Sequence, residues 1–172
     1  MSVPADRRRL RERQRPLKDR YGAEPGAAVL RLRAEGSLAQ TGVTCSVDTG
    51  RALVEAGLHA AAGGDGSSAC SGDLLLQALV ACAGVTLRAV AVNRGLDVTG
   101  TVRAEGELDL RGTLGVDRDV PVGFRTILLH FDLHSDAPAE DLAALVATSE
   151  AYCVVLQTLA GGTRLRVTHD AT

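Results

Sequence analysis

Residues 71–93 form the longest nearly continuous apolar run in the chain, SGDLLLQALVACAGVTLRAVAVN. Its apolar positions cover far more than one stripe of a helix, which is typical of a helix buried on all sides. The pattern predicts a helix that begins near Asp73, a residue type favoured at the N-cap. At about 1.5 Å per residue this helix is roughly 30 Å long, the width of a small domain. Gln77, Arg88 and the charged start argue against a membrane span.

Alternation of apolar and polar residues predicts strands on both sides of this helix. Before it, residues 29–54 contain three short alternating segments with turn signals at Gly36 and Gly42. The short connections between these segments predict antiparallel pairing. After it, residues 98–110 and 124–134 alternate again. The apolar face of the last strand consists of Ile127, Leu129, Phe131 and Leu133.

Helices and a final strand are predicted in the rest of the chain. Residues 5–20 indicate a short polar helix that is broken at Pro16. Asp136 is predicted to cap a later helix, which continues with a break near Ser149 or as one element. Residues 164–170, RLRVTHD, alternate as a terminal strand does.

The order of these elements contains no regular βαβ alternation, so the predicted fold class is α+β. Antiparallel sheets are expected to surround the long buried central helix. One small sheet cannot cover a helix this apolar, so a homodimer is predicted to supply the remaining cover. Residues 1–25 are predicted to be a basic N-terminal arm or helix, and residues 26–172 a single domain.

Charge is distributed unevenly along the chain. The net charge is −2, but residues 1–20 carry eight Lys or Arg and three Asp or Glu, which leaves −7 for the remainder. A basic arm of this kind is typical of a solvated helix or a partner-docking tail. The weak overall charge and the scarcity of aromatic residues argue against nucleic acid as a partner. The first twenty residues lack the apolar core of a signal peptide, which favours a cytoplasmic location.

Cys82 and Cys153 are the candidate chemical groups, although each lies on an apolar helix face where a core cysteine would also lie. The cysteine spacing contains no CxxC pair, so neither a metal site nor a thioredoxin-type motif is expected. A reactive thiol needs hydrogen-bond donors, a cation or a helix N-terminus beside it. Two cysteines that meet can reduce a peroxide, one by attack and the other by resolution as a disulfide.

The two cysteine contexts resemble the OsmC/Ohr family of organic hydroperoxide resistance proteins. The motifs are SGDLLLQALVACAGVTL, which contains Cys82, and YCVVLQTL, which contains Cys153 about seventy residues later. Asp73, nine residues before Cys82, matches the acidic position of many general OsmC-like members. The hairpin arginine of the Ohr branch has no counterpart in AEGSLAQTG, and Arg33 and Arg51 do not match it. The chain therefore resembles the general OsmC-like group more closely than the Ohr branch.

The resemblance implies an OsmC-like fold and an intertwined homodimer with the long helices at its interface. It implies that Cys82 is the peroxidatic cysteine, that Cys153 resolves it, and that Asp73 belongs to the catalytic site. Organic, lipid-type hydroperoxides are the implied substrates and a dihydrolipoyl-type dithiol the implied reductant, with no cofactor and no metal.

Two alternatives stay open. The missing arginine favours a non-catalytic OsmC-like dimer that binds a small apolar or acylated ligand between its subunits. Cys70, in a Gly- and Ser-rich loop before the long helix, is either a spectator or an alternative resolving thiol.

Overall fold

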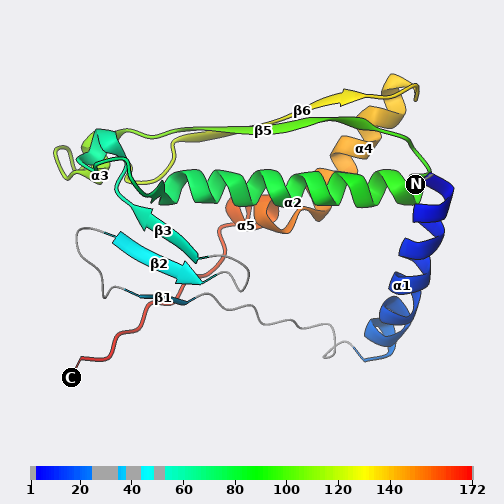
Figure 1. Ribbon diagram of the computed structural model, residues 1–172, viewed down its shortest axis with the longest axis horizontal. Helices are drawn as coiled ribbons and strands as arrows, with labels where there is room; N and C mark the ends of the chain where they lie inside the picture. The colour runs from blue at the N-terminus through cyan, green and yellow to red at the C-terminus, as the bar shows by residue number, and fades with distance from the viewer. Residues whose placement is uncertain (1–2, 25–34, 38–43, 49–52, 172) are drawn as a thin grey trace.

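The computed structural model describes residues 3–24, 35–37, 44–48 and 53–171 (Figure 1). The first half contains α1 (Val3–Ala23), β1 (Glu35–Ser37), β2 (Thr44–Asp48), β3 (Leu53–Gly57), the 3₁₀ turn η2 (Ala60–Ala62) and β4 (Ala69–Cys70). The second half contains α2 (Ser71–Arg94), β5 (Thr99–Glu107), α3 (Leu110–Thr113), β6 (Thr126–His134), α4 (Ala139–Tyr152) and α5 (Val154–Ala160). Helices mixed with small sheets confirm the predicted α+β class. Part of the predicted strand region 29–54 lies outside the described residues.

The strands form two separate sheets, one with the order β1-β2-β3-β4 and one with the order β5-β6. β2 pairs antiparallel with β1 and β3, as their short connections predict, and the register places Cys45 opposite Ala56. β4 is only two residues long and pairs parallel with β3. This parallel pair departs from the predicted antiparallel pattern, because a long loop carries the chain back across the sheet before β4. β5 and β6 pair antiparallel over their full length.

α2 lies between the two sheets and contacts β4, β5, α1, α4 and α5. In Figure 1 it runs below the β5–β6 ribbon, and α4 and α5 cross behind it. Its most buried side chains recur every four residues, which places them on one face of the helix. The ribbon turns its predicted apolar side towards α2, and α4 adds Leu145, which is fully buried. The residues of this buried face are Leu79, Ala83, Leu87 and Ala91.

Within a single chain, α2 is not buried on all sides as its sequence predicts. Val85 leaves 72% of its surface exposed and Leu75 leaves 37%. By length and composition alone, α2 is apolar enough to cross a membrane, as is the bent pair α4–α5 taken together. The contacts of α2 with β5, α4 and α5 are those of a core helix, however. Val85 lies on the side of α2 that these elements do not reach, whereas Leu75 lies one turn before Leu79 on the buried face, near the N-terminal end of the helix.

The ends of α2 differ slightly from the prediction. The helix begins at Ser71 with Cys70 at the N-cap, and Asp73 lies within its first turn. The acidic side chain of Asp73 still stabilises the N-terminal end of α2, because the first turn of a helix carries partial positive charge. Gly95 ends the helix with φ of 77°, a left-handed conformation that glycine adopts without steric cost.

Three other predicted features are wrong. α1 continues unbroken through Pro16, since strong helix formers, mostly Arg, lie on both sides of the proline. Pro138, and not Asp136, occupies the N-cap of α4, and no side chain caps it. Residues 163–171 form no strand, because no strand of the described chain pairs with them.

Gly100 is expected to be the least replaceable glycine of the β5–β6 ribbon. Its φ is +138°, and a Cβ there would lie 1.9 Å from the carbonyl oxygen of Asp132 on β6. Because both atoms are tied into the sheet backbone, we expect Gly100→Ala to lower the free energy of unfolding by about 2–4 kcal/mol, measured by urea denaturation. Gly115→Ala is the matched control, since Gly115 has φ of +68° and open space around it. An equal loss in both variants would contradict the steric argument.

Candidate active site

The structure places Cys82 and Cys153 in one apolar cluster. Cys82 is half-buried in the middle of α2, and Cys153 is only 1% exposed where α4 meets α5. The two thiols lie within hydrogen-bonding range of each other, although 70 residues separate them in the sequence. Cys70, Cys82 and Cys153 are all free thiols. Leu79 and Ala83 complete the buried centre, and partly buried residues around it include Val102, Ala104, Ile127, Leu129, Val155 and Leu156.

A sharp bend in the chain brings Cys153 to this position. α4 and α5 meet at an angle of 69°. Cys153 is the single residue between them, with extended backbone angles of φ −75° and ψ 107°. Its conformation leaves the first N–H groups of α5 without partners inside that helix. Those N–H groups are therefore available to sulfur atoms at the bend.

Hydrogen bonds lower the pKa of the Cys82 thiol. Burial is the largest single influence and acts in the opposite direction, since it disfavours the charged thiolate. The backbone N–H of Val155, the Cys153 thiol, the backbone N–H of Val154 and the Thr86 hydroxyl together outweigh it. Each of these donors stabilises negative charge on sulfur, so the arrangement favours a thiolate at Cys82.

The pKa of Cys153 shifts in the opposite direction, above its ordinary value. Burial is the main cause, and the hydrogen bond and the negative charge shared with Cys82 raise the pKa further. The backbone N–H groups of Leu156 and Val155 offset only part of this rise. The pair is therefore asymmetric, because Cys82 ionises more readily than Cys153, and the Cys153 thiol donates a hydrogen bond to the Cys82 sulfur.

Alkylation at graded pH is expected to separate the two thiols. Because the pKa of Cys82 is lowered and that of Cys153 is raised, iodoacetamide should modify Cys82 at lower pH than Cys153. Peptide mass spectrometry gives the rate at each site. Thr86→Val removes one donor and should move the Cys82 profile to higher pH. The same pH profile at both cysteines in the unmodified chain would contradict the asymmetry.

The other predicted site residues lie farther from the thiols. Asp73 is exposed, and nine residues of helix place it about 13 Å from Cys82 along the axis of α2. Cys70 lies twelve residues before Cys82, or about 18 Å along the axis, which is too far for it to resolve Cys82 in the same chain. Arg33 and Arg51 lie outside the described residues, and the structure describes only the backbone of Cys45.

Sequence reasoning missed two sources of hydrogen bonds at Cys82. Thr86 lies one helical turn after Cys82, and its single hydroxyl proton can be donated either to the Cys82 sulfur or to the Cys82 carbonyl oxygen, which lies 2.8 Å from the hydroxyl oxygen. The spacing of four residues was a usable signal for this contact. The N–H groups of α5 gave no such signal, because the helix break was expected near Ser149 and not at Cys153.

The sequence matches the family model described as OsmC-like protein over residues 64–168, which is more than half of the chain. The chain belongs to the OsmC-like family. The matched region includes both cysteines, α2 and the β5–β6 ribbon. No protein of curated function matches the chain in sequence.

Solved structures with the same fold include three informative OsmC-like relatives. An OsmC-like protein from Mycoplasma pneumoniae has a TM-score of 0.64 at 16% identity, and the match covers 77% of this chain and 89% of that one. An organic hydroperoxide resistance protein OsmC from Legionella pneumophila has a TM-score of 0.56 at 19% identity, covering 78% and 92%. The organic hydroperoxide resistance protein OhrB of Bacillus subtilis has a TM-score of 0.51 at 19% identity, covering 78% and 93%. At these identities the likeness shows a shared OsmC-like fold.

Proposed function

We propose that this OsmC-like chain is a cysteine-based peroxidase that reduces organic hydroperoxides in the cytoplasm and so defends the cell against oxidative stress. The observation that carries the proposal is the pairing of Cys82 and Cys153, with the Cys82 pKa lowered and the Cys153 pKa raised. A structural pair of core cysteines has no need of this asymmetry. Family membership and the hydroperoxide resistance proteins among its structural relatives point to the same chemistry.

The reaction consists of three balanced steps. The Cys82 thiolate attacks one oxygen of the hydroperoxide, the O–O bond breaks, and the alkoxide that leaves takes a proton to become an alcohol. Cys82 is then a sulfenic acid. The Cys153 sulfur attacks the Cys82 sulfur, a disulfide forms, and the hydroxyl leaves as water. A dithiol reductant of the dihydrolipoyl type restores both thiols and is itself oxidised to a disulfide.

The surroundings of Cys82 support an organic substrate. Aliphatic side chains from α2, β5, β6 and α5 gather around the two thiols. An alkyl or acyl chain gains free energy from contact with such a surface, whereas hydrogen peroxide has no apolar part to bury. A lipid-type hydroperoxide therefore suits the site better than hydrogen peroxide does.

The direct test is to treat the reduced protein with one equivalent of cumene hydroperoxide. We expect an intact mass lower by two hydrogen atoms, and a peptide map in which Cys82 is joined to Cys153. Dihydrolipoamide should restore the thiols and support repeated turnover. Oxidation that left Cys82 unmodified, or linked other cysteines, would count against the proposal.

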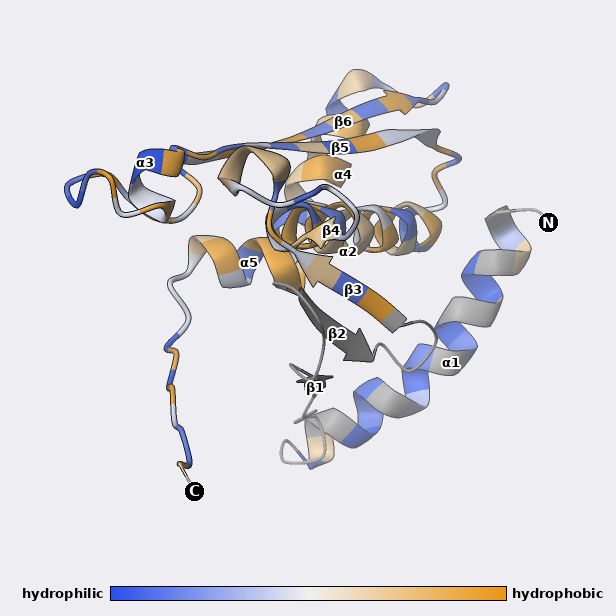
Figure 2. Cartoon of the chain, turned by 60° about the vertical axis from the view of Figure 1, so that its left-hand side comes forward, coloured by the Kyte–Doolittle hydropathy of each residue, from blue (hydrophilic) through white to orange (hydrophobic). Residues whose placement is uncertain are grey.

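The active form is an intertwined homodimer, as the exposed surfaces of the single chain suggest. Ala81 and Val85 on α2 are exposed beside Cys82, and Val85 is 72% uncovered. Residues 163–171 leave the body after α5, where Leu165 is 86% exposed and Val167 95% (Figure 2). Apolar residues this exposed, on a core helix and on a segment with a strand pattern, are typical of surfaces that a second subunit covers.

Val85→Asp is therefore expected to convert a dimer into a monomer, as measured by sedimentation velocity at micromolar concentration. A carboxylate at a buried subunit interface is desolvated without a partner, which costs several kcal/mol. Leu128→Asp is the matched control, because Leu128 is 60% exposed on the outer side of β6, away from α2. A wild-type chain that sediments as a monomer would refute the dimer.

A second function remains open, namely a non-catalytic dimer that binds a small apolar or acylated ligand. One observation favours it: among the described residues, the groups that lower the pKa of Cys82 are neutral donors, with no guanidinium among them. The alkylation profile separates the two functions. A Cys82 thiol that ionises only near the ordinary value of about 8.5 favours ligand binding, and one already ionised at neutral pH favours catalysis.

A further inference from the structure

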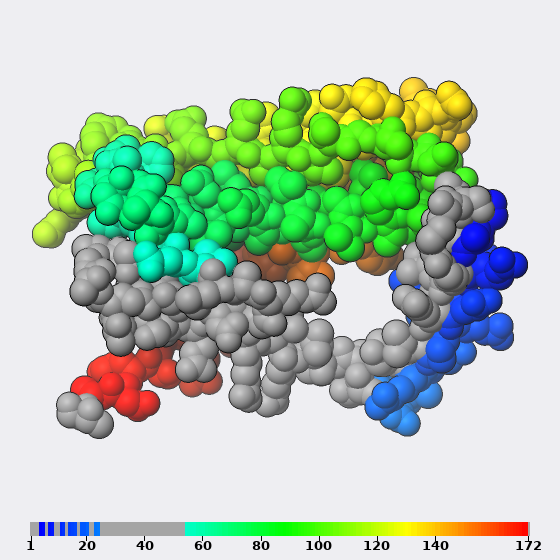
Figure 3. Space-filling model, in the orientation of Figure 1, coloured from blue at the N-terminus to red at the C-terminus, as the bar shows by residue number. Residues whose placement is uncertain are grey.

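A groove of about 1010 Å³ lies between α1 and the C-terminal end of α2. α1 stands as an arm along one end of the molecule (Figure 3), and most of its described residues are hydrophilic (Figure 2). The α2 side of the groove consists of Asn93 and Gly95. The cationic residues that line it from α1 are Arg7, Arg8, Arg11, Arg15 and Lys18.

The positive charge of this groove is not balanced within the described chain. Among the lining residues that the structure describes, the acidic ones are Glu12 and Asp19, so five cations against two anions leave a charge of +3. Among the described side chains of α1, the ion pair found is Arg20–Glu24, outside the groove. Arg7, Arg11 and Arg15 follow one another at intervals of four residues, a spacing at which like charges repel and weaken a helix.

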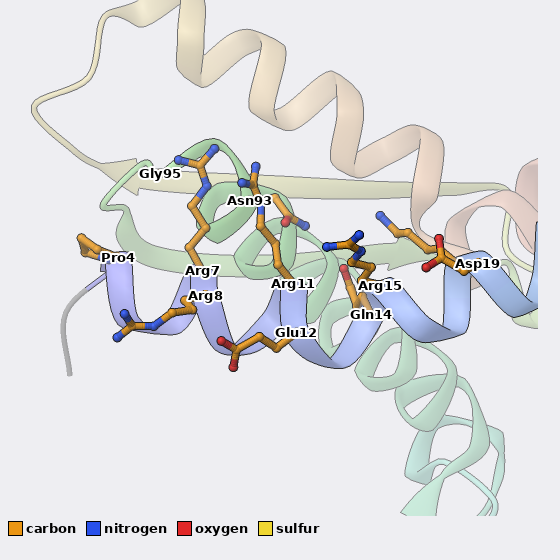
Figure 4. A pocket seen from close by; sticks show the side chains of 11 residues that line it. Pro4, Arg7, Arg8, Arg11, Glu12, Gln14, Arg15, Asp19, Asn93 and Gly95 are labelled. Carbon is orange, nitrogen blue, oxygen red and sulfur yellow. The ribbon is translucent and has the colours of Figure 1, made fainter.

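Arg7 and Arg11 extend from α1 towards the end of α2, where Asn93 and Gly95 lie (Figure 4). The Nε atom of Arg7 is buried and has no hydrogen-bond partner among the residues that the structure describes. A Cβ atom on Gly95 would lie 3.4 Å from Nη1 of Arg7, so the guanidinium rests close to the α2 terminus. Attraction between one cation and the negative end of the α2 dipole explains the position of Arg7. It does not explain the further cations in the same groove.

We propose that the α1–α2 groove binds a compact anion that carries two or more phosphate groups. Guanidinium groups form paired, charge-assisted hydrogen bonds with phosphate oxygens, and Asn93 adds an amide donor. The bound anion removes the repulsion along α1 and provides an acceptor for the unpaired Arg7 donor. The groove has the size of a small-molecule site, and the lining residues that the structure describes include no aromatic residue on which a base would stack.

The charge of the rest of the chain favours a compact ligand over an extended polyanion. Residues 21–172 carry a net charge of −7, the difference between −2 for the chain and +5 for residues 1–20. This acidic body repels a membrane surface or a nucleic acid that extends beyond the groove. The site is separate from the thiol pair, because Asn93 lies eleven residues, or about 16 Å of helix, beyond Cys82.

Calorimetric titration of the full chain with inorganic pyrophosphate tests the site, with orthophosphate for comparison. We expect pyrophosphate to bind more tightly than orthophosphate, and Arg11→Gln to weaken pyrophosphate binding by about tenfold or more. Arg20→Gln is the matched control, since it removes the same charge from α1 outside the groove. It should change the affinity by less than about twofold. Circular dichroism reports whether each variant keeps its helices.

Several outcomes would overturn the proposal. Equal weakening by Arg11→Gln and Arg20→Gln would mean that the anion responds only to the charge of the arm. No binding of pyrophosphate at millimolar concentration, with α1 intact, would mean that the groove is no phosphate site. Binding to phosphatidylserine vesicles or duplex RNA that pyrophosphate does not displace would assign the arm to a macromolecular surface. None of these results bears on the peroxidase activity, which is measured separately at Cys82.

Discussion

Replacement of Cys82 by serine is expected to abolish hydroperoxide turnover, with a loss of about 10³-fold or more in kcat/KM. The donors around this position lower the pKa of a thiol, which makes its ionised form more accessible. A serine hydroxyl starts from a far higher pKa, so the same hydrogen bonds leave it protonated and unable to attack an O–O bond. Consumption of cumene hydroperoxide in the presence of dihydrolipoamide measures the effect.

Cys70→Ser is the control for this experiment. Cys70 is half-buried at the N-cap of α2, about 18 Å along the helix from Cys82. Serine is a favoured N-cap residue, so the variant should fold at least as well as the wild type and keep its turnover. Unchanged turnover in Cys82→Ser, or an equal loss in Cys70→Ser, would refute the role proposed for Cys82.

The periodicity of apolar residues along the chain correctly predicted β6 and α2, whose patterns are set by their own local sequence. The alternation in residues 124–134 identified β6 and the side of it that faces α2, because a strand half-covered by a core must alternate. The long apolar run identified α2 within two residues of its start. Pro16 misled the prediction because it removes only one hydrogen bond, and the strong helix formers around it maintain α1.

The candidate site was only partly visible in the sequence. The contexts of Cys82 and Cys153 indicated a pair through family resemblance, but nothing local to either cysteine showed which one ionises. That asymmetry arises from the burial of Cys153, which raises its pKa, and from the 69° bend there, which lets the first N–H groups of α5 lower the pKa of Cys82. A bend at one residue without glycine or proline leaves no pattern in hydrophobicity. The unexpectedly exposed side of α2 likewise follows from what surrounds the helix and not from its own residues.

Replacement of Cys153 by serine is expected to preserve the first chemical step and to stop the cycle after it. Cys82 keeps the N–H donors of Val154 and Val155, and a serine hydroxyl at position 153 still donates a hydrogen bond to the thiolate. One equivalent of alcohol should therefore form in a burst. Without a resolving sulfur, Cys82 stays a sulfenic acid, and steady-state turnover should fall by about 10²-fold or more.

Mass spectrometry distinguishes this outcome from a simple loss of structure. With excess hydroperoxide, Cys82 in Cys153→Ser should advance to the sulfinic acid, whereas the wild type should stop at the disulfide. Ser149→Ala is the matched control, because Ser149 is also fully buried, one turn earlier in α4, and its hydroxyl donates only to the Leu145 carbonyl oxygen at 2.7 Å. That variant perturbs the same core but retains both sulfur atoms, so it should form the disulfide and resist overoxidation. If Cys153→Ser turned over at the wild-type rate, the external dithiol would have to reduce the sulfenic acid at Cys82 directly. Cys153 would then be a core residue whose thiol donates a hydrogen bond to Cys82 and takes no part in resolution.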